Sequence, residues 1–255
     1  MQGVRVEATR RSESPWPYFG VLVAATWCAD LLWHGRAHAA GGVAATTVAW
    51  LLMTAAMMTP TTVPMLSALF DVVGRRESRT WWWFLVGYLA VWAAFGVAAA
   101  QLQIALARLG VVTEHGVFVS NTFAGVALLG AGAYQFTPLK NRCRELCMRP
   151  MKFFMVHWRS GTVGAIQMGV RHGVACLGCC AALMLLAFVG GMANWGFMAL
   201  ATAVMVVEKL PSVGRRITVP LGLVLLVAGI TMFLVQPLDA PSHIHHHAST
   251  EGTTP

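Results

Sequence analysis

The stretch GVRHGVACLGCC, residues 169–180, places one histidine and three cysteines within an apolar segment that is long enough to cross a membrane. A hydrocarbon core about 30 Å thick needs roughly 20 helical residues. Because a backbone in lipid must satisfy its own hydrogen bonds, such segments are predicted to be helices. Seven segments meet this description, at 18–34, 43–69, 81–107, 117–137, 164–190, 193–209 and 217–235. The sequence therefore predicts an all-α fold, a polytopic transmembrane helix bundle of about seven spans.

Charge is scarce in this chain and unevenly distributed. Of 255 residues, 57% are apolar and 11% are charged, whereas soluble domains carry roughly a quarter charged residues. Most of the 18 Lys and Arg residues lie in four connecting regions, 1–17, 70–80, 138–163 and 210–216. Basic residues collect on the cytoplasmic side of membrane proteins. The N-terminus is therefore predicted in the cytoplasm and the C-terminus outside.

This pattern also predicts how the chain is divided. We expect a cytoplasmic N-terminal tail at 1–17, a transmembrane bundle at 18–235 with a cytoplasmic loop at 138–163, and a His-containing extracytoplasmic tail at 236–255. The net charge of +8 does not indicate nucleic acid, because no basic helix interleaved with aromatic residues is found. The lipid bilayer is the predicted partner. No Ser-His-Asp order, Walker loop or catalytic carboxylate pair is found, so no catalytic residue and no enzymatic activity are predicted.

Five of the six cysteines fall into two groups. Cys143 and Cys147 lie one helical turn apart in the loop at 138–163, so their side chains share a face. In the other group, His172, Cys176, Cys179 and Cys180 share one stripe of a helix. Thiolates with a nearby imidazole suit zinc, Cu(I) or an iron–sulfur cluster. The spacings do not match the known iron–sulfur ligand runs, so a copper or zinc ion is preferred to a cluster.

Two other interpretations of the cysteines stay open. The protein is a membrane thiol–disulfide carrier if the two groups exchange a disulfide, although thiols in the cytosol are kept reduced. It is a structural accessory subunit of a larger membrane complex if the cysteines only pack, because free Cys is among the most buried residue types.

Three further sets of residues are candidates for metal handling. An outer metal site is predicted at His34, His38, His243, His245, His246 and His247, because neutral imidazoles bind zinc and copper. A pathway is predicted at Met53, Met57, Met58 and Met65, beside Pro60 and Pro64, which should kink or unwind the second span. Asp30, near His34, and Glu208, at the end of 193–209, are predicted to support ligands through hydrogen bonds.

Several motifs together resemble a known family. They are Tyr134–Pro150 with its Cys-x-x-x-Cys, Gly169–Cys180, Gly191–Asn194, Glu208–Pro211 and the Pro-rich Met segment Met57–Met65. In this order they resemble a family of uncharacterised bacterial inner-membrane proteins that are described as predicted metal-binding integral membrane proteins. The resemblance covers residues 43–235. It implies a multi-pass bundle in the bacterial inner (cell) membrane, with ligands Cys143, Cys147, His172, Cys176, Cys179 and Cys180.

The sequence therefore predicts a membrane protein that binds a soft transition metal, with copper favoured over zinc. Its predicted role is metal handling or transfer, with a metal chaperone or a larger membrane complex as partner. This hypothesis requires that the thiols of the 138–163 loop meet the thiols of the fifth span closely enough to share one ion.

Overall fold

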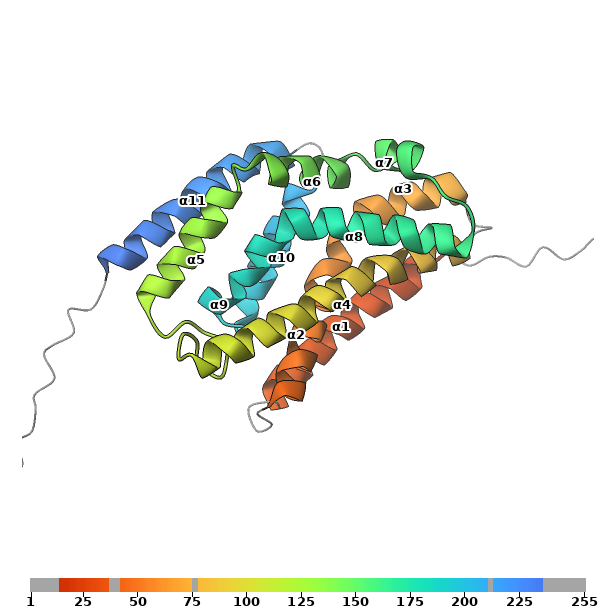
Figure 1. Ribbon diagram of the computed structural model, residues 1–255. Coiled ribbons are helices and arrows are strands. Elements are labelled where there is room, and N and C mark those ends of the chain that lie inside the picture. The colour runs from red at the N-terminus through yellow and green to blue at the C-terminus, as the bar shows by residue number, and fades with distance from the viewer. Residues whose placement is uncertain (1–13, 37–41, 75–77, 211–212, 236–255) are drawn as a thin grey trace, which may run out of the picture.

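The computed structural model describes residues 14–36, 42–74, 78–210 and 213–235 (Figure 1). Across these ranges the only paired extended backbone is an isolated antiparallel bridge between Val112 and Phe118. The rest of the regular structure is helical, as predicted. The helices are α1 (Trp16–Arg36), α2 (Val43–Thr61), α3 (Val63–Val73), α4 (Ser78–Arg108), α5 (Asn121–Tyr134), α6 (Pro138–Met148), α7 (Pro150–His157), α8 (Gly161–Leu185), α9 (Ala187–Gly190), α10 (Trp195–Glu208) and α11 (Gly214–Leu234).

The long helices pack side by side, and the short ones cross them. α4 runs along α8, α2 packs on α4, and α1 packs on α2. At the other end of the molecule α5 pairs with α11, and α10 contacts α2, α8 and α11 (Figure 1). The short helices α6 and α7 lie along one edge, where α6 packs against α8. This arrangement brings α6, α8 and the end of α10 together.

Four helical segments in the described residues are long and apolar enough to cross a membrane, judged by length and composition. They are Val43–Thr61, Arg79–Arg108, Gly161–Gly190 and Arg216–Leu234. Each of the seven predicted segments contains helix, but α5 and α10, within 117–137 and 193–209, are only 14 residues long. The helical character of the chain is thus confirmed, and the number of spans stays a prediction.

The predicted interruption beside the two prolines is present. The segment 43–69 divides into α2 and α3 at Thr62. Pro60 lies inside the last turn of α2, and Pro64 lies in the first turn of α3, where a missing N–H is tolerated. The carbonyl oxygen of Met58 accepts hydrogen bonds from the hydroxyls of Thr61, at 2.8 Å, and Tyr88, at 3.0 Å. Side-chain hydroxyls therefore provide hydrogen bonds to a backbone carbonyl beside the helix break.

Glycines let α4 and α8 approach closely. A Cβ on Gly169 of α8 would overlap the carbonyl oxygen of Phe84, and a Cβ on Gly87 of α4 would overlap that of Ile166. A Cβ on Gly173 would lie 2.9 Å from Cβ of Val91. Small residues at such crossings bring helix backbones together. The close crossing fixes the first half of α8, and with it the helix that carries three cysteines.

Candidate metal centre

The three cysteines of α8 form a compact buried group. The sulfurs of Cys176, Cys179 and Cys180 all lie within 4.8 Å of one another, and each side chain is buried. The sulfurs of Cys179 and Cys180 are 3.3 Å apart. The spacing of three and four residues explains this grouping, because such positions are neighbours on a helix surface.

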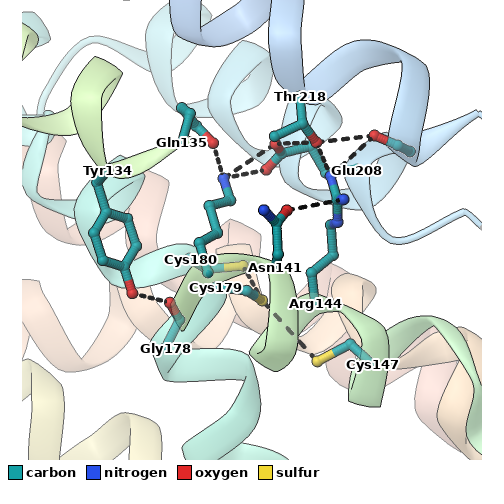
Figure 2. Close-up of polar contacts among 12 residues, drawn as sticks. Tyr134, Gln135, Asn141, Arg144, Cys147, Gly178, Cys179, Cys180, Glu208 and Thr218 are labelled. Atoms are coloured by element: carbon teal, nitrogen blue, oxygen red, sulfur yellow. Dashed lines mark hydrogen bonds and ion pairs between the residues drawn. The ribbon is translucent and has the colours of Figure 1, made fainter. Parts of the chain in front are cut away.

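A fourth sulfur comes from α6. The sulfur of Cys147 lies 4.0 Å from that of Cys179, and Figure 2 shows the Cys147 side chain directed toward the pair Cys179 and Cys180. Cys147 is buried as well. We call the four residues Cys147, Cys176, Cys179 and Cys180 the thiol cluster. The predicted loop at 138–163 thus contains two helices, and one of them delivers a thiol to α8.

Cys143 lies at the edge of the thiol cluster. It is half-buried, and its sulfur would be 2.5 Å from a Cβ placed on Gly178, the residue before Cys179. The hydroxyl of Tyr134 donates a hydrogen bond to the carbonyl oxygen of the same glycine. The Cys143 sulfur therefore packs against the bare backbone of α8 at Gly178, next to Cys179.

A buried polar network holds α6 in place. The ammonium of Lys140 donates to both carboxylate oxygens of Glu208, at 3.0 and 3.1 Å, and also to the side-chain oxygen of Gln135. One turn later, the guanidinium of Arg144 donates to Thr218 of α11 and to Asn141 (Figure 2). Because Lys140, Arg144 and Cys147 follow one another at helical spacing, the network that anchors two of them also positions the third.

The start of α6 is defined by its sequence. Thr137 is the N-cap, and its hydroxyl accepts a hydrogen bond from the backbone N–H of Lys140 at 3.3 Å. Pro138 follows at the first helical position, where its missing N–H costs nothing. The Thr-Pro pair after α5 therefore begins a new helix and sets the rotation that turns Lys140 inward.

Three polar side chains from other helices surround Cys176. The ammonium of Lys209 donates to the Cys176 sulfur at 2.9 Å and to the Thr61 hydroxyl at 2.7 Å. The Tyr88 hydroxyl lies 3.2 Å from the same sulfur and 3.1 Å from the Thr61 hydroxyl. These contacts were missed by sequence reasoning, because α2, α4 and the end of α10 meet only in the folded chain.

His172 is on the predicted stripe but is surrounded by rings. Its imidazole stacks on Phe84 and Tyr88, with ring centroids 5.8 and 5.4 Å away, and meets the edge of Phe153 at 5.9 Å. Its ring nitrogens do not belong to the compact group of Cys176, Cys179 and Cys180. Both nitrogens are buried, and among the described residues neither has a hydrogen-bond partner.

The remaining predicted site residues are not members of the thiol cluster. The pathway methionines are buried: Met53, Met57, Met58 and Met65. Asp30 is buried in α1. Glu208 contacts Lys140 and Thr218, whereas its neighbour Lys209 contacts the thiol cluster. The backbone of His34 belongs to α1, and its side chain and the other outer-site residues lie outside the described part of the chain, namely His38, His243, His245, His246 and His247.

The thiol cluster has the composition of a soft-metal site. Thiolates select Cu(I) and zinc over harder ions. With metal–sulfur bonds of about 2.3 Å, sulfurs in a tetrahedral site lie about 3.8 Å apart, and the separations of 3.3 and 4.0 Å bracket this value. Burial raises the pKa of the Cys143 thiol, and a hydrogen bond with Cys176 raises the pKa of Cys147 well above its ordinary value. Metal binding here must therefore displace protons.

Comparison with known proteins agrees with this chemistry. A family model for copper chaperones, PpoB2, matches residues 47–232, which is more than half of the chain and runs from α2 to α11. The matched range includes Cys143 and the whole thiol cluster. A search of curated proteins and a search of solved structures gave no match. The chain belongs to the PpoB2 family of copper chaperones.

Proposed function

We propose that this protein binds Cu(I) through the thiol cluster and passes the ion to an acceptor protein. The observation that carries the proposal is the meeting of four buried sulfurs from two separate helices, with Cys147 of α6 4.0 Å from Cys179 of α8. A copper ion that is buried and cannot exchange would suit a storage protein. A protein that delivers copper needs a route by which the ion can leave the cluster. We assign that route to Cys143, because it is half-buried and its sulfur lies against Gly178, the residue before Cys179.

The donor set suits a soft ion, and the description of the family favours copper over zinc. The four clustered donors are all sulfur, and soft thiolates suit Cu(I). The family to which the chain belongs is described as copper chaperones. His172 is retained as a candidate ligand, since both of its ring nitrogens lack a hydrogen-bond partner among the described residues. The proposed role is metal handling without catalysis.

A membrane location is part of the proposal. Within the described ranges, four helical segments have the length and composition of membrane spans, and the basic residues of 138–163 favour a cytoplasmic position for α6 and α7. We propose seven spans in the bacterial inner membrane, with the thiol cluster near the cytoplasmic face. His34, His38 and the tail histidines would then form an outer site, and the buried methionines of α2 and α3 a path between the two.

The experiment is metal analysis of protein purified without oxygen after growth in copper. The wild-type protein is expected to retain about one copper per chain, and a Cys176→Ser/Cys179→Ser variant close to none. Cys28→Ser is the matched control, because Cys28 is an exposed thiol on α1 outside the cluster. Equal, near-zero copper in wild type and double variant rejects the proposal.

A second candidate, a thiol–disulfide carrier, is favoured by the short distance between Cys147 and Cys179. Disulfide formation needs the two sulfurs to approach to about 2 Å, a small movement of one side chain. Mass-tagging of free thiols before and after mild oxidation separates the two functions. Reversible loss of two tags at Cys147 and Cys179 supports the carrier, whereas protection of the thiols by Cu(I) supports the metal site.

A further inference from the structure

A buried lysine, Lys209, lies directly against the thiol cluster. Lys209 is 2% exposed, and its ammonium donates hydrogen bonds to the Cys176 sulfur at 2.9 Å and to the Thr61 hydroxyl at 2.7 Å. Lys209 is the C-cap of α10, where its side chain turns into the bundle. A charged group in such surroundings is costly to bury unless it is paired. The position of the Lys209 ammonium against the Cys176 sulfur therefore suggests a functional role.

The neighbouring carboxylate does not neutralise this cation. Glu208 accepts two hydrogen bonds from Lys140, and the hydroxyl of Thr218 donates a third to it at 3.3 Å. Within the described part of the chain, the two recorded acceptors of the Lys209 ammonium are a sulfur and a hydroxyl. Its positive charge is thus directed at the thiol cluster, and any metal ion held there lies in its field.

The repulsion between this ammonium and a bound ion grows with the charge of the ion. By Coulomb's law the repulsion felt by a divalent ion is twice that felt by a monovalent ion in the same place. Zn(II) and Cu(I) have the same closed d shell and both accept thiolates, so their charge is what a fixed cation can distinguish. The effect is strong in a buried site, because little water screens it.

We propose that Lys209 is a specificity-determining residue that biases the thiol cluster toward monovalent soft ions and against divalent ones. This inference rests on the proposed metal-binding function and adds to it the charge of the cargo. The sulfurs of the thiol cluster attract any soft cation. The positive charge of Lys209 weakens the binding of each ion, and it weakens the binding of a divalent ion more than that of a monovalent one. In this way a set of sulfurs that suits zinc and copper alike becomes selective for copper in its reduced form.

The test compares Ag(I) with Cd(II), which are soft closed-shell ions that differ by one charge and do not change oxidation state in air. Association constants are measured by chelator competition for the wild-type protein and for Lys209→Gln, which removes the charge and keeps a hydrogen-bond donor. A unit charge about 4 Å away at an effective dielectric constant of about 20 changes a binding constant by roughly 10³-fold per unit of ion charge. Relaxation reduces this, so we expect the Cd(II)/Ag(I) affinity ratio to rise by about tenfold or more.

Two further variants distinguish the effect of the Lys209 charge from the effect of a changed side-chain shape. Lys209→Arg keeps the positive charge and should keep the wild-type ratio, while Lys152→Gln removes an exposed charge from α7 and should leave both affinities unchanged. If Lys209→Gln does not yield folded protein, Lys209→Leu is the second neutral variant. An unchanged ratio in the neutral variant, or an equal change in Lys209→Arg, overturns the inference. Failure of the wild-type protein to bind either ion instead rejects the proposed function.

Discussion

The sulfur of Cys147 lies 4.0 Å from the sulfur of Cys179, although the two residues belong to different helices and are 32 positions apart in the chain. Cys147 lies in the last turn of a short amphipathic helix, and Cys179 lies in a long apolar one. Movement of α6 away from α8 would therefore remove one sulfur and leave three. A site that can change from four donors to three has a means of releasing its ion.

The contribution of Cys147 can be counted by spectroscopy. We expect Cys147→Ser to lose one sulfur from the copper coordination shell and to bind Cu(I) at least tenfold more weakly, because the three thiols of α8 remain. X-ray absorption at the copper edge measures the sulfur count of the loaded protein. A spectrum identical to that of the wild type would mean that Cys147 packs against the site without binding metal.

The Lys140–Glu208 ion pair is predicted to keep α6 on α8. Both side chains are almost fully buried, and their charged atoms lie 3.0 Å apart. Replacing one partner leaves a buried charge uncompensated, which costs about 3–5 kcal/mol. Lys140→Met should lower the free energy of unfolding by this amount and weaken Cu(I) binding, because Cys147 lies on the same helix. Denaturant unfolding in detergent and copper competition measure the two effects.

The control for this variant lies on the same helix. Arg142 is exposed on α6, so Arg142→Met should change stability by less than about 0.5 kcal/mol. The double variant Lys140→Met/Glu208→Gln should recover part of the stability, since neither buried charge is then left alone. If the loss of stability in the double variant equals the sum of the losses in the single variants, the ion pair does not hold α6 on α8.

Periodicity explains why so much of the fold was predictable. The apolar segments stand out because each is bounded by charged or Gly/Pro-containing connections, and the break at Thr62 followed from Pro60 and Pro64. The stripe of Cys176, Cys179 and Cys180 likewise depends only on helical spacing within one segment. Asn194 caps α10, its side chain accepting a hydrogen bond from the N–H of Phe197 at 3.1 Å.

The side chains that contact this cysteine stripe could not be predicted from the sequence, because those contacts depend on packing between helices. Glu208 and Lys209 are adjacent, which suggests that they pair, yet their side chains leave α10 in different directions toward Lys140 and Cys176. His172 has the correct spacing for a ligand, but the rings of Phe84 and Tyr88 cover it from α4. Helical spacing gives the face of a residue and does not say which side chains oppose it.

The crossing of α4 and α8 should depend on Gly169. A methyl group there would meet the backbone of Phe84, which cannot move aside like a side chain. Overpacking of this kind costs about 1–3 kcal/mol or more. Gly169→Ala is therefore expected to lower the unfolding free energy, whereas Gly130→Ala on α5, with open space around its Cβ, should be neutral or slightly stabilising. Equal stability of the two variants would contradict the close crossing.

Copper affinity should rise with pH. Burial raises the pKa of the Cys143 thiol, and hydrogen bonding to Cys176 raises that of Cys147, so both thiols hold their protons at neutral pH. Binding as thiolate releases those protons, and each proton released changes the apparent affinity by about tenfold per pH unit. The increase continues until the pH passes the raised pKa values. Competition titrations at several pH values between 6 and 8 measure the slope, which Cys143→Ser should lower by one proton if Cys143 is a ligand.

Gly178 offers a way to test the position of Cys143 without touching a thiol. The Cys143 sulfur would lie 2.5 Å from a Cβ at this position, so Gly178→Ala must push the sulfur away from α8. The atom that must move is the end of a side chain and not backbone, so we expect little loss of stability but faster alkylation of Cys143 by a water-soluble maleimide. Copper transfer to a competing chelator should slow if Cys143 is the exit ligand. Unchanged alkylation and transfer rates in Gly178→Ala would place Cys143 away from the route, and Gly130→Ala serves as the matched helix control.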